Sequence, residues 1–240
     1  MISVCIATYN GGPYIRQQIA SILPQLGDAD EVVISDDQST DDTLQQIQAL
    51  GDPRIRIVSH QPAKAKFNVD RSTHNFANAI RCAKGDVIFL ADQDDVWLPG
   101  KVAKVSQALA DSDLVMTDCS IADEHLNILK PSYAAERPFR LGLWQNFLKS
   151  SFLGSCMAFR RQVFESAQPF PRYGVAHDLW LGMVAMKRFR VAYVPEPLML
   201  YRRHSRTVTT SGTSATRSLL FKIRYRLYIA RALLRLTKNG

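Results

Sequence analysis

The last forty residues of this 240-residue chain contain no acidic side chain. All 22 Asp and Glu residues lie at or before Glu196, whereas residues 201–240 hold ten of the 30 Lys and Arg residues. The first 200 residues therefore have 20 basic and 22 acidic side chains, and the formal net charge of +8 arises from the C-terminal segment. This asymmetry favours an anionic partner for the tail, either a membrane surface or a nucleic acid.

Long apolar runs are also missing. No stretch approaches the roughly 20 apolar residues that span a bilayer. The N-terminus enters a strand-like segment directly, with no charged region before it, unlike a signal peptide. We therefore predict a cytoplasmic protein that reaches the inner face of the plasma membrane, at most, as a peripheral protein.

Cysteine is scarce, with four residues in the chain and no Cys-x-x-Cys pair. No histidine lies at metal-ligand spacing from them. Cys5, Cys119 and Cys156 fall within apolar, strand-like segments. They are typical of small buried hydrophobic residues in a reducing compartment.

Strand-like and helix-like segments alternate over the first half of the chain. Apolar strands are expected at residues 2–7, 31–35, 55–58, 87–90 and 114–117, and helices near residues 14–26, 44–50, 75–83 and 99–109. This rhythm predicts an α/β fold with a mostly parallel, doubly wound sheet. After residue 120 the pattern loosens, with a hairpin, a loop at 131–140, a helix from His177 and two short strands at 191–194 and 198–202. A Ser/Thr-rich linker at 207–216 separates a domain of residues 1–212 from a C-terminal helix, residues 213–240.

Three carboxylates follow the buried strand at residues 87–90. Asp92, Asp94 and Asp95 lie at its C-terminal end, where open α/β sheets bind ligands. Asp92 and Asp94 are two residues apart, so on an extended strand both side chains point to one side. Two such carboxylates repel each other unless a cation lies between them. The cluster predicts Mg²⁺ or Mn²⁺ held against a diphosphate; the alternative is a solvated acidic turn.

Seven motifs occur in a fixed order over residues 1–204. They are Val4-Cys5-Ile6-Ala7-Thr8-Tyr9-Asn10, Asp36-Asp37-Gln38-Ser39-Thr40-Asp41, Asn75-Phe76, Asp92-Gln93-Asp94-Asp95-Val96-Trp97, Gly154-Ser155-Cys156-Met157, His177-Asp178 and Tyr201-Arg202-Arg203-His204. Together they resemble glycosyltransferase family 2, inverting sugar transferases with the GT-A fold. The Asp-Gln-Asp-Asp-x-Trp form resembles its rhamnosyltransferase-like branch, which builds bacterial O-antigens and capsules. The chain departs from the family pattern at His177, where Glu or Asp is usual, and lacks the family's Asn after the last motif.

The resemblance implies a GT-A domain that transfers a sugar from a dTDP- or UDP-linked donor to a saccharide or lipid-linked acceptor. It implies Asp178 as the catalytic base and Asp94 and His204 as ligands of Mn²⁺ or Mg²⁺. The implied donor-binding residues are Thr8, Tyr9, Asn10, Asp37, Asn75, Asp92 and Gln93. Asp37 is expected to accept a hydrogen bond from the imide N–H of uracil or thymine, and Asp92 to contact the ribose.

Each of these assignments has a structural alternative. Thr8 to Asn10 also suit a plain strand-to-helix turn, and Asn75 suits a structural side chain. Asp178 begins an apolar helix, where Asp is favoured as a cap. His204 is a lone histidine, which is more often structural, and the charges of Arg202 and Arg203 suit either an exposed strand or a leaving diphosphate.

The tail from residue 217 to residue 238 has the composition of a basic amphipathic helix. Its cationic stripe consists of Arg217, Arg224, Arg231, Arg235 and Lys238. Such a helix suits an anionic membrane surface, and the alternative is a helix docked on protein. A nucleic-acid-binding role for the tail is a weaker alternative, because the remaining chain is nearly neutral and no RNA-binding motif is present.

A sugar nucleotidyltransferase is a further alternative for the enzyme as a whole, but its Gly-rich loop is missing after the first strand.

Overall fold

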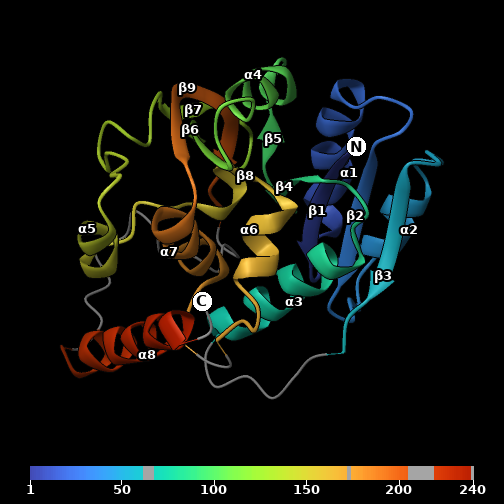
Figure 1. Ribbon diagram of the computed structural model, residues 1–240. Coiled ribbons are helices and arrows are strands. Elements are labelled where there is room, and N and C mark those ends of the chain that lie inside the picture. Colours follow the sequence, from blue (N-terminus) through green and yellow to red (C-terminus); the bar gives the residue numbers. More distant parts are fainter. Residues whose placement is uncertain (62–67, 172–173, 205–218, 239–240) are drawn as a thin grey trace.

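A nine-stranded sheet organises this computed structural model, which describes residues 1–61, 68–171, 174–204 and 219–238. The strands are β1 (Ile2–Thr8), β2 (Glu31–Asp36), β3 (Ile55–Ser59), β4 (Val87–Asp92), β5 (Val96–Trp97), β6 (Leu114–Ala122), β7 (Ile128–Lys130), β8 (Met157–Arg160) and β9 (Val191–Arg202). The helices are α1 (Gly12–Ile22), α2 (Thr43–Gln48), α3 (Asn68–Cys82), α4 (Lys101–Ala108), α5 (Leu143–Leu148), α6 (Arg161–Ser166), α7 (His177–Arg188) and α8 (Leu219–Lys238), with short 3-10 turns at Leu23–Gln25 and Gly154–Cys156. The strand order is β3-β2-β1-β4-β8-β6-β9-β5, and β7 pairs with β6 (Figure 1).

Strands β1 to β4 form a parallel block. β1 lies between β2 and β4, and β3 pairs with β2. Val4, Val33 and Phe89, near the middle of three of these strands, have no exposed surface, as expected for apolar runs covered on both faces. The alternation predicted from the sequence is confirmed here. Because the strands share a direction, the ends of β1, β2 and β4 meet at one edge of the sheet, where such folds bind ligands.

Beyond β4 the sheet is mixed. β8 runs antiparallel to both β4 and β6, β9 runs parallel to β6, and β5 runs antiparallel to β9. The predicted α/β architecture is confirmed, with parallel pairing confined to the first block and to the β6–β9 pair.

The strand β9 is continuous over twelve residues, where the sequence predicted two short strands at 191–194 and 198–202. The break was expected because Pro195 and Pro197 lack the backbone N–H that a sheet uses. The chain instead continues with register shifts against β6. This continuity carries Arg202 to the end of β6, opposite Ala122.

Helices α3, α6 and α7 lie together across one face of the sheet (Figure 1). The helix α3 starts at Asn68, seven residues before the expected start at Asn75, and has Asp70 in its first turn, where the helix dipole favours a negative charge. The three cysteines predicted to be buried, those of β1, β6 and the turn before β8, are buried free thiols. Burial raises the pKa of the Cys5 thiol above its ordinary value.

The helix α8 packs on the rest of the chain through one face. Ile229 is 1% exposed and belongs to the main hydrophobic core, with Tyr228 and Leu233 partly buried beside it. Arg226 donates a hydrogen bond to the backbone carbonyl of Leu148 in α5. The predicted C-terminal helix is therefore present, and this face of it contacts protein.

The predicted linker at 207–216 and the boundary at residue 212 lie outside the described residues. Within the described ranges, no helix is both long and apolar enough to cross a membrane.

We expect Ile229→Ala to lower the free energy of unfolding of the whole chain by roughly 2–4 kcal/mol, because it leaves a cavity in the shared core. Leu227→Ala is the matched control on the same helix, since Leu227 is 63% exposed. Chemical denaturation followed by circular dichroism measures both. An unchanged unfolding midpoint for Ile229→Ala, with a separate transition for the tail, would show that α8 folds as an independent unit.

Candidate active site

The side chain of Gln93 joins the ends of β1 and β4. Its Oε1 accepts hydrogen bonds from Oγ1 of Thr8 at 2.6 Å and from the backbone N–H of Tyr9 at 2.9 Å. Its Nε2 donates to the Tyr9 carbonyl at 3.2 Å, and Asn75 of α3 donates to the Thr8 carbonyl at 3.2 Å. The structure thus brings these four predicted donor-binding residues together. It also gives Gln93 and Asn75 a positioning role that the sequence did not reveal.

The loop after β1 is held by Asn10. This residue has a φ of 49°, in the left-handed region that Asn tolerates better than most residues. Its Oδ1 accepts a hydrogen bond from the N–H of Thr40 at 2.8 Å, and its own N–H donates to Oγ of Ser39 at 2.9 Å. The Asn10 side chain therefore shapes the loop, and a donor contact by its backbone stays a prediction.

Asp37, just after β2, is 3% exposed and accepts hydrogen bonds on both carboxylate oxygens. Arg71 of α3 donates to Oδ2 through Nε at 3.1 Å and Nη2 at 2.8 Å. Nδ1 of His60, after β3, lies 2.8 Å from Oδ1. Oδ2 already accepts two hydrogen bonds and Oδ1 one, so Oδ1 can still accept a ligand N–H.

Sequence reasoning missed Arg71 and His60. The guanidinium of Arg71 lies 4.8 Å from the ring centre of Tyr9, whose side chain is 45% exposed. His60 directly follows β3, which pairs with β2. A polar residue at that strand end, next to the end that Asp37 follows, was the signal in the sequence that could have identified it. Arg71 lies on a helix that was expected to begin after it, so its position toward Asp37 was not predictable.

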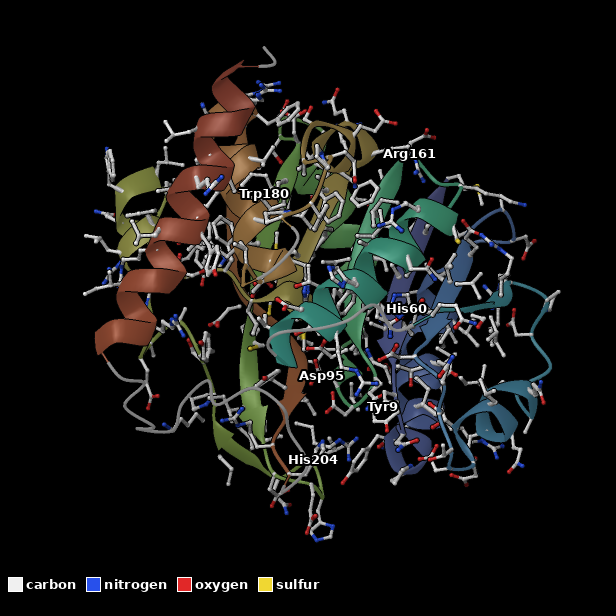
Figure 2. The ribbon with its side chains drawn as sticks, turned by 90° about the horizontal axis from the view of Figure 1, so that it is seen from below. Tyr9, His60, Asp95, Arg161, Trp180 and His204 are labelled. Atoms are coloured by element: carbon white, nitrogen blue, oxygen red, sulfur yellow. The ribbon has the colours of Figure 1, made fainter. Side chains whose placement is uncertain are left out.

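The acidic cluster lies where β4 ends. The strand stops at Asp92 and the chain turns at Gln93 and Asp94, so the strand alternation expected for Asp92 and Asp94 does not extend to the second carboxylate. The charge of Asp94 still acts on Asp92: burial, then the charges of Asp94 and Asp178, raise the pKa of Asp92 to about 7. Figure 2 shows Tyr9, His60, Asp95 and His204 gathered in one part of the molecule, away from Trp180.

Asp95 lies inside the protein and has no exposed surface. Its Oδ1 accepts a hydrogen bond from the backbone N–H of Arg202 at 3.0 Å, and its Oδ2 has no partner in the described part of the chain. Burial, together with the charges of Asp94 and Asp92, raises the pKa of Asp95 well above its ordinary value. Asp95 is therefore a structural member of the cluster that fastens the end of β9.

Lys101, in the first turn of α4, is a buried cation that sequence reasoning missed. It is 1% exposed, and its Nζ donates to the Ser155 carbonyl at 2.8 Å and lies 4.5 Å from the ring centre of Trp97. Burial lowers the pKa of Lys101, whereas buried thiols and the carboxylates of Asp95 and Asp92 raise it. The sequence offered one signal: Lys101 lies four residues before Val105, on the same buried face of α4.

Asp94 and His204 meet although 110 positions separate them in the chain. Nε2 of His204 lies 2.8 Å from Oδ2 of Asp94, and the His204 ring packs on Tyr14, with ring centres 4.6 Å apart. Arg202 holds this arrangement, since its Nε donates to the Asp94 carbonyl at 2.7 Å. Its guanidinium also donates to the Glu124 carbonyl, and it is 4% exposed. Arg202 is thus engaged by the protein and does not face a leaving diphosphate.

The residues of this pair fit a divalent cation shared with a ligand. A carboxylate and an imidazole are ligands that Mn²⁺ accepts, and Mg²⁺ or Mn²⁺ in such sites takes its remaining ligands from phosphate oxygens and water. In the described ranges, no group of three or more His, Cys, Asp and Glu side chains forms a complete protein-only site. Asp94 and His204 would therefore supply two ligands of such a cation.

Asp178 lies in the first turn of α7, and Ala176 occupies the N-cap position. Its Oδ1 accepts a hydrogen bond from the N–H of Leu179 at 2.7 Å, and the helix dipole favours its charge. The carboxylate is half-buried and close enough to Asp92 to raise the pKa of Asp92. The structure thus places the predicted base beside the acidic cluster.

The ring of His177 packs on Phe76, with ring centres 4.2 Å apart, and lies against Gly154, where an added Cβ would come within 2.6 Å of Nε2. Both ring nitrogens are without a hydrogen-bond partner among the described residues. Burial lowers the pKa of His177, which favours a neutral ring.

Comparison with known proteins agrees with this geometry. The model of the family described as Glycosyl transferase family 2 matches residues 3–167. The GalNAc(5)-diNAcBac-PP-undecaprenol beta-1,3-glucosyltransferase of Campylobacter jejuni is 26% identical, over 95% of this chain and 71% of that protein. The dTDP-rhamnosyl transferase RfbG of Shigella flexneri is 23% identical, over 92% of this chain and 77% of that protein.

A solved structure shares the fold. Glucosyl-3-phosphoglycerate synthase from Mycobacterium tuberculosis, in complex with Mn²⁺, UDP and phosphoglyceric acid, superposes with a TM-score of 0.60 at 19% identity, over 98% of this chain and 78% of that one. Since the family match covers more than half of the sequence and the fold agrees with it, the chain belongs to glycosyl transferase family 2 and is a glycosyltransferase of the GT-A type.

Proposed function

We propose that this enzyme transfers a sugar, with inversion and with the help of a divalent metal, from a UDP- or dTDP-linked donor to a lipid-linked saccharide in bacterial surface polysaccharide synthesis. The observation that carries this proposal is the contact of Asp94 with His204 at the end of β4, with the Asp178 carboxylate near Asp92. One face of the site then holds a diphosphate and the other receives an acceptor hydroxyl.

The donor base lies between the loops after β1 and β2. Asp37 accepts the imide N–H of uracil or thymine, and Arg71 and His60 hold its carboxylate in place. Thr8, Tyr9 and the Asn10 backbone line the same edge, and Asp92 contacts the ribose. A carboxylate acceptor selects a base edge that presents an N–H, which N3 of uracil or thymine offers and N3 of cytosine does not.

Asp94 and His204 hold Mn²⁺ or Mg²⁺ together with the donor diphosphate. A bound divalent cation neutralises charge that develops on a leaving phosphate group. The Mycobacterium tuberculosis enzyme named above holds Mn²⁺ and UDP in its structure, which supports the same class of ligand here.

Asp178 takes the proton of the acceptor hydroxyl. As the oxygen attacks the anomeric carbon from the side opposite the diphosphate, its acidity rises, and a carboxylate placed there receives the proton. The first turn of α7 fixes the position of Asp178, so the base is already in place before the acceptor arrives. His177, neutral and buried, supports the packing behind it.

The names of the relatives support the acceptor class. The Campylobacter jejuni enzyme is named for an undecaprenol diphosphate acceptor and for glucosyl transfer, and the Shigella flexneri protein for a dTDP-rhamnosyl donor. We propose dTDP-rhamnose as the first donor to test and a UDP-hexose as the second. A lipid-linked acceptor of this kind places the enzyme in the cytoplasm, at the inner face of the plasma membrane.

Asp94→Asn should weaken binding of UDP in the presence of Mn²⁺ by on the order of 100-fold. Even substitution of a residue that only orients a metal ligand typically lowers metal affinity 10- to 100-fold. Titration calorimetry with UDP, with and without Mn²⁺, measures this. Asp111→Asn is the control, since Asp111 is an exposed carboxylate outside the site. Unchanged Mn²⁺-dependent affinity in Asp94→Asn would remove Asp94 from the metal site.

Asp37→Asn should weaken UDP and dTDP binding about tenfold or more, since a hydrogen bond to a charged group contributes roughly 1.5–3 kcal/mol. Binding of CDP should change little, because N3 of cytosine carries no hydrogen, so the preference for uracil and thymine nucleotides falls. Competition of each nucleotide against a fluorescent UDP derivative measures the ratio. Equal loss for CDP would mean that Asp37 supports the loop without reading the base.

Asp178→Asn should keep the donor affinity of the native enzyme and lose about 10²- to 10⁴-fold in the rate of transfer, because the acceptor hydroxyl keeps its proton. Glu165→Gln, in α6, is the matched control. Release of UDP from donor and acceptor over time gives the rate, and calorimetry gives the affinity. Near-native turnover would assign the base to another residue, with His177 the next to test.

A further inference from the structure

Exposed apolar side chains gather in one region of the protein. Ten large hydrophobic residues are exposed among the described side chains, and six of them lie in or beside α5 and α8. These six are Leu141, Trp144, Leu148, Ile223, Leu227 and Leu234, which we call the α5–α8 face. Trp144 is the most exposed of them, at 75%. An apolar cluster of this kind marks an interaction surface more often than chance exposure does.

The two helices are neighbours, although about seventy residues separate them in the chain. α8 lies beside α5 (Figure 1), and Arg226 donates a hydrogen bond to the Leu148 carbonyl at the end of α5. At 3.6 residues per turn, Ile223, Leu227 and Leu234 fall within about 40° of one another on the helix. The buried Ile229 lies on the opposite side. α8 thus packs on the protein through one side and exposes apolar residues on the other.

The charged residues of the chain segments that contain α5 and α8 have one sign. Residues 137–164, which include α5, hold five Lys and Arg residues and no Asp or Glu, and the chain after Glu196 holds ten and none. Arg140 and Lys149 flank the apolar residues of α5, and Arg231 belongs to α8; all three are exposed. A face that combines apolar side chains with cations complements a surface that is both apolar and anionic.

We propose that the α5–α8 face docks the enzyme on an anionic lipid bilayer, with Trp144 at the headgroup boundary. Tryptophan favours this boundary because its ring is apolar and its N–H is polar. The apolar residues enter the boundary layer while Lys and Arg contact anionic headgroups. This surface needs neither donor nor acceptor, so it can be tested apart from glycosyl transfer.

A second copy of the chain fits the face less well. A two-fold dimer would place the same surface against itself, so cations would meet cations without acidic partners. A nucleic acid would satisfy the cations, but it leaves the aliphatic residues of both helices exposed to water. An anionic bilayer, unlike these two partners, satisfies the charge and the apolar area together.

The fluorescence of Trp144 offers a direct test in the full-length protein. The chain contains three tryptophans, and Trp97 and Trp180 are each 2% exposed. Vesicles of equimolar phosphatidylglycerol and phosphatidylcholine should shift the emission to shorter wavelength, whereas pure phosphatidylcholine should not. Trp144→Phe should abolish the shift and still sediment with the anionic vesicles.

The double substitution Trp144→Ser and Leu227→Ser should weaken co-sedimentation with anionic vesicles on the order of 100-fold, since each of the two large apolar side chains removed from water contributes roughly a factor of ten or more. Ile128→Ser with Leu129→Ser is the matched control, because both residues are 59% exposed on β7, outside the face. High salt should weaken binding of the native protein as charges are screened. UDP affinity, measured on every variant, should stay native.

Five results would overturn the proposal. The native protein could stay in the supernatant with anionic vesicles at low salt, or the emission could stay unchanged while the protein sediments. The β7 control could lose as much binding as the double variant. A single-stranded RNA could bind more tightly than the vesicles, or native protein could be a dimer that the double variant dissociates; either would assign the face to another partner. Native UDP binding in any of these cases would leave the proposed catalytic function standing.

Discussion

The repulsion among three carboxylates at the end of β4 is the constraint around which the site is arranged. Asp92, Asp94 and Asp95 lie within four residues, and burial raises the pKa of two of them. A buried lysine of α4 and hydrogen-bonding groups from the end of β9 and the residues after it lie against this cluster. The Lys101 ammonium lies buried near them, the Arg202 backbone N–H binds Asp95, and His204 contacts Asp94. A divalent cation, bound together with the donor diphosphate, would balance the negative charge that remains.

The long strand β9 makes this balance possible. Its parallel pairing with β6 runs past the two prolines and delivers Arg202 to the turn after β4. The Arg202 guanidinium, which the sequence left open as a diphosphate contact, ties together the Asp94 carbonyl, the Glu124 carbonyl and the Gln17 side chain. In this protein the last motif therefore fixes the geometry of the motif that begins at Asp92.

On the donor side, too, neighbouring side chains hold in place the residues that are proposed to contact the ligand. Asp37 is the residue proposed to read the base, and Arg71 and His60 fix its carboxylate by hydrogen bonds. Gln93 and Asn75 fix the loop of Tyr9 in the same way. Preorganised side chains of this kind lose little freedom when a ligand binds, which favours affinity. On the far side of the molecule, α8 uses one side for packing and keeps apolar and cationic residues for the proposed membrane contact.

The sequence by itself determined the α/β class, the parallel block β1–β4, the buried cysteines, the C-terminal helix and the family. These rest on local patterns: apolar periodicity, turn residues and motifs in order. It also identified Asp37, Asp94, Asp178 and His204 as polar residues in those motifs. Tertiary structure alone decided that Asp94 meets His204, that Lys101 and Arg202 face inward, that β8 inserts antiparallel between β4 and β6, and that α8 lies beside α5. The reason is physical: local patterns record which side of an element is buried, whereas a contact across 110 residues depends on strand order and register, which no local pattern encodes.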